Sequence, residues 1–178
     1  MLNANPDGSN TLCASLLEKI REQFERTSHL IGLVPAAQLD WAPPMAEGRP
    51  GAWTMGELLG HLLECMAGFC AVLAAAEPQR LEHFATLREV LVNHRCPPDE
   101  AAARIEVYRA HTEEGFALLT DTDLARRVPT VFVERGEPLL TLLLGNLEHL
   151  TNHKHQLFTY LKLMGVQVAT RDLYQFRA

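Results

Sequence analysis

One long apolar stretch, residues 138–164, constrains the fold most, because it has helical spacing and no proline after its first residue. Pro138 suits the first turn of a helix, and Gly165 suits the position just past its end. At about 1.5 Å per residue, such a helix spans roughly 40 Å. Its apolar side chains recur at the spacing found where helices pack together: Leu143, Leu147, Leu150, Leu157, Leu161 and Met164.

Three other segments are predicted to be long helices. The first begins near Thr11, where apolar and charged residues alternate at helical spacing, and ends before Pro35. The second runs from Thr54 to about Glu77, and Thr54-Met55-Gly56-Glu57 forms a capping box at its start. The third begins near Pro98 and continues through Leu119. The chain is therefore predicted to be an all-α protein.

The connections between these helices are long. Residues 35–53 hold six prolines and glycines and are predicted to be a surface connection. Residues 79–97 are predicted to contain a short helix from Leu81 to about Asn93, and their length allows the second and third helices to run parallel. Residues 121–137 are predicted to be a loop with a short extended segment at 130–133. We expect residues 1–10 to form a loose tail and residues 166–178 to lie back on the bundle.

Composition limits the classes of function. The 178 residues, 47% of them hydrophobic, suit a single domain over residues 11–178. A net charge of -6 argues against a nucleic-acid partner. We find no signal peptide and no uninterrupted apolar run of transmembrane length, so we expect a soluble, cytoplasmic protein with no membrane partner. The four cysteines, Cys13, Cys65, Cys70 and Cys96, lack the spacing of a disulfide or zinc motif and are expected to be reduced thiols.

Histidines in the fourth helical segment suggest a metal site. His149 and His153 lie four residues apart at the margin of the apolar stripe, so both rings can reach one ion. His155 falls near the opposite side and is expected to face solvent. The spacing alone arises often by chance, and a histidine on a helix margin is usually a packing residue. His61 occupies the same margin of the second helix, which makes it the third predicted ligand.

A tri-histidine site suits Zn²⁺, Ni²⁺ or Fe²⁺ and leaves a coordination position open for a substrate. Such an ion lowers the pKa of bound water or activates a thiolate. Glu64 and Glu148 are candidates to accept a ligand's other ring N–H, with solvated carboxylates as the simpler interpretation. Asn152 and Gln156 either orient a substrate or are surface polar residues.

Other residues lie close to the predicted ligands in the sequence or are of the same type. Cys65 lies one turn after His61, but its place in the apolar stripe favours a core residue over a ligand or nucleophile. Gly68, two turns along from His61, leaves space that a substrate could enter. The remaining histidines share no spacing with the predicted ligands and are assigned no role: His29, His83, His94 and His111.

Two motifs resemble those of the DinB/YfiT-like helical bundles. W-T-M-G-E-L-L-G-H-L is similar to the family pattern W-s-x-x-E-l-l-x-H-l, with its histidine at His61. H-L-T-N-H-K-H-Q is similar to H-x-x-x-H-R-G-Q, with His149, His153 and Gln156 on the motif positions. Lys154-His155 replaces the usual Arg-Gly of that pattern. The resemblance covers about residues 11–166.

The resemblance implies a four-helix bundle with up-down-down-up topology, frequent homodimers, and a divalent metal on His61, His149 and His153. It also implies an enzyme acting on a small-molecule substrate, most plausibly a thiol-dependent S-transferase or isomerase that uses a low-molecular-weight thiol and an electrophile. Two alternatives stay open: a metal-dependent hydrolase, and a non-catalytic bundle that binds metal or a partner.

Overall fold

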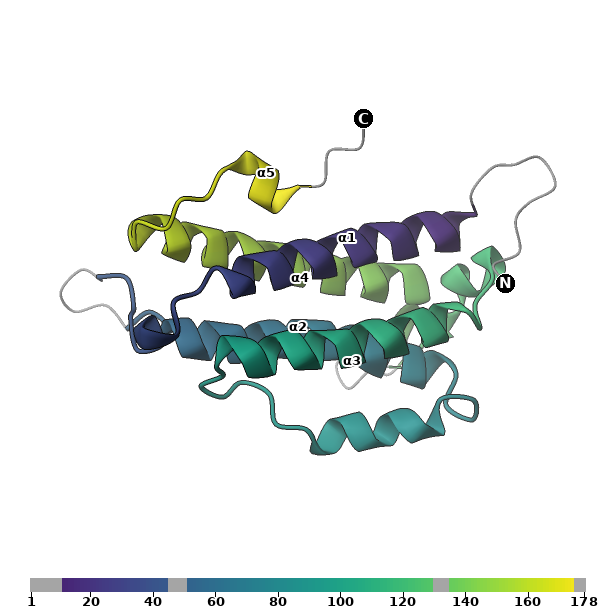
Figure 1. The fold of residues 1–178 in the computed structure, drawn as a ribbon. Helices are drawn as coiled ribbons and strands as arrows, with labels where there is room; N and C mark the ends of the chain where they lie inside the picture. The colour runs from purple at the N-terminus through teal and green to yellow at the C-terminus, as the bar shows by residue number, and fades with distance from the viewer. Residues whose placement is uncertain (1–10, 45–50, 130–134, 175–178) are drawn as a thin grey trace.

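The protein is an all-helical bundle in the computed structural model, which describes residues 11–44, 51–129 and 135–174. The long helices are α1 (Leu12–Gly32), α2 (Met55–Ala76), α3 (Pro98–Phe116) and α4 (Leu139–Leu163). In Figure 1, α1 and α4 run in one direction along the bundle, and α2 and α3 run in the other. The predicted up-down-down-up topology and the parallel pairing of the second and third helices are therefore confirmed.

Helix α2 is the central helix of the bundle. It packs against both α3 and α4, while α1 packs across the same two helices. The ring of Phe69 on α2 meets that of Phe24 on α1 edge to face, with centroids 5.7 Å apart. By length and composition alone α2 is apolar enough to cross a membrane, but 56% of its most apolar window is buried inside the bundle. That burial fits the core helix of a soluble protein.

Side chains fix the first turns of α1 and α2. The Thr54 hydroxyl accepts the backbone N–H of Glu57, and the Glu57 carboxylate accepts the N–H of Thr54 in return, so the predicted capping box is confirmed. At the start of α1, Thr11 accepts from the N–H of Ala14. These caps fix where each helix begins and therefore which turn carries each functional residue.

The segment between α2 and α3 differs from its prediction. The predicted short helix is present but shorter: the 3-10 helix η2 (Glu82–Glu89) ends four residues before Asn93 and is followed by a loop. Within that loop, the N–H of Asn93 donates to the carbonyl of Gly60 at 3.1 Å, and the N–H of Cys96 donates to that of Gly56 at 3.0 Å. In a continuing helix these two N–H groups would donate to carbonyls of the same helix. Here they donate to carbonyls of α2 instead, so the loop packs on α2 and the helix does not continue.

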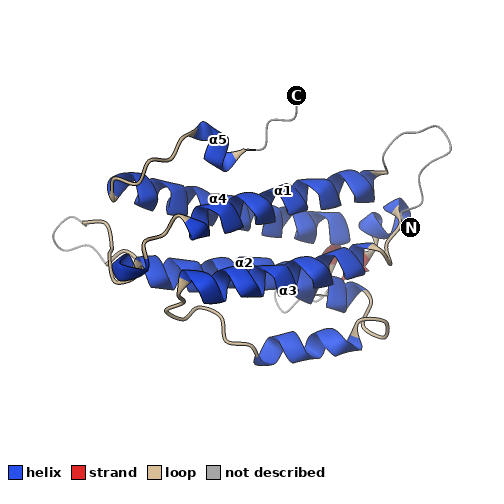
Figure 2. Cartoon of the chain, in the orientation of Figure 1, coloured by secondary structure: helices blue, strands red, loops and turns tan. Residues whose placement is uncertain are grey.

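Short elements lie before α4. The 3-10 helix η3 (Asp121–Ala125) leads into β1 (Arg127–Val128), which pairs antiparallel with β2 (Glu137–Pro138). The predicted extended segment at 130–133 lies outside the described residues, as does the predicted tail at 1–10. Pro138 is the N-cap of α4 rather than part of its first turn. Figure 2 shows how small this sheet is beside the helices.

The chain after α4 packs back onto α1, as predicted. It carries the one-turn helix α5 (Thr170–Leu173). A separate 3-10 helix, η1 (Ala36–Gln38), lies in the loop after α1. Lys154 of α4, which is 1% exposed, contacts both α1 and α5. Its ammonium donates to Gln23 Oε1 at 2.6 Å and to the carbonyl of Leu173 at 2.9 Å. Lys154 therefore connects α4, α1 and α5.

Candidate metal centre

Three histidines converge where α2 lies against α4. His61 from α2 and His149 and His153 from α4 each offer a ligand atom, and these atoms all lie within 4.8 Å of one another. His61 Nε2 is 3.2 Å from His149 Nε2, and the ring of His153 packs edge-on against that of His61 with centroids 4.4 Å apart. The structure thus brings together the three residues that the sequence predicted from two distant segments.

Hydrogen bonds to residues outside the cluster hold two of these rings in one orientation. His61 Nδ1 lies 2.8 Å from Asn93 Oδ1 and 3.0 Å from Glu64 Oε2. Because both neighbours are acceptors, Nδ1 carries the ring proton and Nε2 keeps its lone pair toward the other histidines. His153 Nδ1 is 2.9 Å from Gln156 Oε1 and donates in the same way. Such outer partners orient the histidines of metal sites and raise their basicity.

The surroundings keep the two histidines of α4 neutral. Burial is the main cause that lowers the pKa of His149, and the neighbouring charge of His61 adds to it. Burial likewise lowers the pKa of His153 and outweighs the opposing effect of the hydrogen bond that His153 donates to Gln156. Neutral imidazole is the form that binds a metal. Three ring nitrogens facing one point fit a divalent ion that prefers nitrogen, such as Zn²⁺, Ni²⁺ or Fe²⁺.

Trp53 covers one side of the cluster. Its ring centroid lies 4.3 Å from that of His61 and 5.5 Å from that of His153. A cavity of about 300 Å³ opens beside these rings, lined by Trp53, Glu57, His61, Glu64 and Asn93. A small molecule in that cavity would lie against His61 and the indole.

The contact between Asn93 and His61 depends on how the loop meets α2. Asn93 has a left-handed backbone, with φ of 57°, a conformation that asparagine adopts more readily than most residues. A Cβ at Gly60 would lie 1.9 Å from the carbonyl oxygen of His94, so only glycine lets the loop approach. The sequence analysis missed Asn93. The signals that could have found it are the glycine just before His61 and an asparagine close to Pro97-Pro98.

The structure separates the candidate partners that the sequence named. Of the two carboxylates, Glu64 contacts His61, whereas Glu148 is exposed. Of the two amides, Gln156 contacts His153, whereas Asn152 is exposed. Each exposed member of these pairs has the simpler surface role.

Three further expectations about this region can be compared with the structure. His155 is exposed, as expected, and Cys65 is a buried core residue, 2% exposed, also as expected. The substrate space predicted at Gly68 is wrong. A Cβ there would meet the side chain of Asn146 at 3.3 Å, because that amide fills the space from α4.

Comparison with known proteins agrees with this architecture. The family model of the DinB superfamily matches residues 19–157. The chain belongs to the DinB superfamily. No curated protein matches it. The resemblance seen in the two histidine motifs is therefore confirmed at the level of the family.

Solved structures of similar fold include two bacterial DinB-like proteins. The one from Bacillus subtilis has a TM-score of 0.63 at 18% identity and covers 86% of this chain and 94% of its own. The one from Bacillus cereus has a TM-score of 0.61 at 18% identity, with 86% and 93% covered. A mycothiol-dependent maleylpyruvate isomerase has a TM-score of 0.55 at 18% identity, with 82% and 60% covered. At this identity the likenesses show the fold, which this superfamily shares with an enzyme.

Proposed function

We propose that this DinB superfamily member is a metal-dependent enzyme in which His61, His149 and His153 hold one divalent ion. The reaction is transfer of a low-molecular-weight thiol to a small electrophile, or thiol-dependent isomerisation of that electrophile. The observation that carries the proposal is the convergence of three ring nitrogens within 4.8 Å. The thiol-dependent isomerase of similar fold supports the choice of thiol chemistry.

When bound, a divalent ion held by three imidazoles supplies an open coordination position at which the pKa of a thiol falls. The protein's own residues prepare that position. Asn93 and Gln156 hold the rings of His61 and His153 in the required tautomer. Trp53 covers one side and limits the access of water to the site.

The cavity beside His61 indicates which substrates fit. Its volume of about 300 Å³ suits a small molecule, and the indole of Trp53 offers an apolar wall. Hydrogen bonds from the backbone and hydroxyl of Thr54 lower the pKa of Glu57, so this lining residue is a carboxylate at neutral pH. With Glu64 beside it, the lining disfavours electrophiles that carry several negative charges.

Hydrolysis by metal-activated water is the second candidate, and the contacts of the lining carboxylates make it the weaker one. A hydrolase of this type commonly uses a carboxylate as general base. Glu57 is engaged by the capping box, and Glu64 lies 3.0 Å from His61 Nδ1. A site closed by four protein ligands would favour the non-catalytic alternative. Within the described part of the chain, this ligand group contains three side chains, which leaves a position open.

Homodimer formation stays a prediction.

The test is a thiol-transfer assay on purified protein, with cysteine as the thiol and chlorodinitrobenzene as a chromogenic electrophile, run with and without a chelator. We expect turnover that the chelator abolishes and added Zn²⁺ or Ni²⁺ restores. His153→Ala should abolish turnover, while His155→Ala, an exposed histidine on the same helix, should retain it. Turnover that survives the chelator or His153→Ala would contradict the proposal.

A further inference from the structure

A second group of metal-ligand side chains lies where the loop after η2 enters α3. It consists of His94, Cys96 and Glu100, whose ligand atoms all lie within 4.8 Å of one another. His94 Nε2 is 2.9 Å from Glu100 Oε1. We propose that these three side chains form a binding site for a thiolate-preferring divalent metal such as Zn²⁺, separate from the tri-histidine centre.

The chemistry of the ligands selects the class of metal. A thiolate, an imidazole and a carboxylate together suit Zn²⁺ or Co²⁺ and disfavour Mg²⁺ and Ca²⁺, which prefer oxygen. The Cys96 side chain is 0% exposed, whereas those of His94 and Glu100 are 19% and 40% exposed. An ion there would be held from the protein side by sulfur and would keep room for water on the solvent side.

The backbone holds these ligands in place before any ion binds. Cys96 is fixed by the hydrogen bond from its N–H to the carbonyl of Gly56. The backbone of His94 lies against Gly60, where no Cβ would fit. Glu100 stands in the first turn of α3, which anchors it to a long helix. Ligands placed on such supports need little reorganisation to bind a metal.

The contacts within the group leave a role for a cation. His94 Nδ1 is buried and has no hydrogen-bond partner among the described residues, which is uncommon for a buried polar atom. The carboxylates of Glu100 and Asp99 lie near the Cys96 thiol. Their negative charges act on this buried thiol. A divalent ion at this point would neutralise the charge of these carboxylates.

The guanidinium of Arg104 is the competing cation. It lies 3.3 Å from Glu100 Oε1, but it also donates to Tyr108 Oη at 2.6 Å and to the carbonyl of Leu91. These other acceptors hold the guanidinium beside the group. The alternative to a metal site is thus an ion-paired group of His94, Glu100 and Arg104 that only fastens the loop.

Cobalt titration distinguishes the two. A thiolate ligand gives Co²⁺ a charge-transfer band in the near ultraviolet that a site of three imidazoles does not give. We expect this band in the wild-type protein, its loss in Cys96→Ser, and its retention in His149→Ala. Cys70→Ser is the matched control, because Cys70 is a buried thiol that contacts the carbonyl of Tyr108 and the hydroxyl of Thr112 and should leave the band unchanged.

Glu100→Gln keeps the experiment decisive if Cys96→Ser fails to fold, which circular dichroism would reveal. This variant changes a half-exposed side chain and should weaken the affinity for Co²⁺ by about 10- to 100-fold. Absence of the near-ultraviolet band in folded wild-type protein would overturn the proposal, as would a band that survives both substitutions. A band lost in His149→Ala would show that the two sites are not separate.

Discussion

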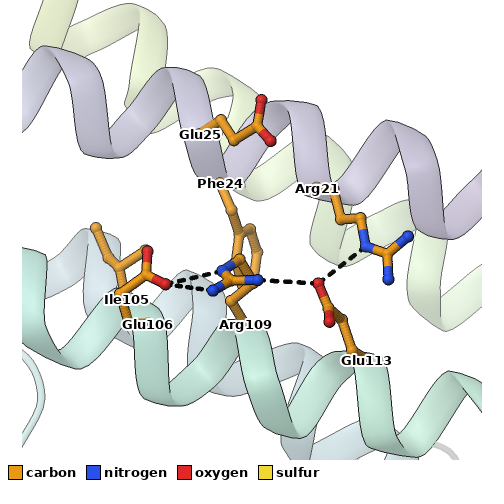
Figure 3. Close-up of a pocket in the computed structure, with 7 residues that line it drawn as sticks. All are labelled: Arg21, Phe24, Glu25, Ile105, Glu106, Arg109 and Glu113. Atoms are coloured by element: carbon orange, nitrogen blue, oxygen red, sulfur yellow. Dashed lines mark hydrogen bonds and ion pairs between the residues drawn. The ribbon is translucent and has the colours of Figure 1, made fainter.

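The two sides of the bundle hold cavities of opposite character. Between α1 and α3 lies a groove of about 440 Å³, larger than the 300 Å³ cavity beside His61. Figure 3 shows that its two arginines are paired with carboxylates: Arg109 lies between Glu106 and Glu113, and Arg21 reaches the same Glu113. Each of these cations already has a carboxylate partner, so the groove presents a satisfied surface network.

On the α2–α4 side, groups of one kind face one another. His61, His149 and His153 point ring nitrogens at a common centre, and the hydrogen-bond partners Asn93 and Gln156 lie outside it. The comparison teaches that cavity volume is a poor guide to the proposed site in this protein. A better indication of a site is a set of lone-pair donors that face one point while their hydrogen-bond partners lie outside it.

Gly60→Ala should have the largest effect, because it acts on the support of the α2–α4 side. The added Cβ would lie 1.9 Å from the carbonyl oxygen of His94. We expect a loss of about 3 kcal/mol in the free energy of unfolding, at the upper end for overpacking. Gly145→Ala on α4 is the control, since no atom lies within 4 Å of its added Cβ, and it should be neutral or stabilising. Urea unfolding of both variants measures the difference, and equal effects would contradict the account.

Lys154→Ala tests the hydrogen bonds of the buried cation on the α1 side. It leaves Gln23 Oε1 and the carbonyl of Leu173 without their donor, so we expect a loss of about 2 kcal/mol in unfolding free energy. Burial lowers the pKa of Lys154 to about 8 from 10.5, so between these values the unfolded state binds more protons. Wild-type stability should therefore rise with pH across this window relative to the variant. A difference that stays constant from pH 7.5 to 10.5 would contradict the burial argument.

Asn93→Gly tests the outer support of His61 without straining the loop, because glycine tolerates the left-handed backbone at this position. The ring of His61 would lose the acceptor at 2.8 Å, so metal affinity should fall by about 10- to 100-fold. Asn93→Asp, which keeps an acceptor oxygen, should retain most of the affinity. Calorimetric titration with Zn²⁺ measures both, and an unchanged affinity in Asn93→Gly would show that the contact is incidental.

Glu113→Gln should have the smallest effect, although it disrupts the network of the larger groove. Burial favours the protonated form of Glu113, but hydrogen bonds and charges from Arg21 and Arg109 outweigh it and lower the pKa of the carboxyl. Partly exposed pairs of this kind contribute about 0–1 kcal/mol. We expect a change below about 1 kcal/mol in stability and no change in metal affinity. A fall in metal affinity would mean that the two sides are coupled.

Helical periodicity was sufficient to predict the long helices and the position of the histidines. The capping box at Thr54 fixed the start of α2, and the four-residue spacing of His149 and His153 fixed their shared face. Lys154 was also within reach of this reasoning, because it continues the stripe that contains Leu150 and Leu157. A lysine is seldom found in a core, so the buried position of Lys154 was not predicted.

Contacts that depend on the path of a loop were not predictable in this way. Asn93 meets His61 only because the chain leaves η2 early, takes a left-handed turn and crosses α2 at Gly60. No period in the sequence encodes such a path. The prediction of a substrate space at Gly68 was wrong for a related reason. The space that the missing side chain leaves on α2 is occupied by the Asn146 side chain of α4.

The most direct test of the central claim is a crystal structure of the protein grown with Zn²⁺, with anomalous scattering used to locate the ion. The account predicts a peak at about 2.0–2.1 Å from a ring nitrogen of each of His61, His149 and His153, with a coordination position free of protein ligands. Three histidine rings hydrogen-bonded to one another in saturating Zn²⁺, with no anomalous peak between them, would contradict it.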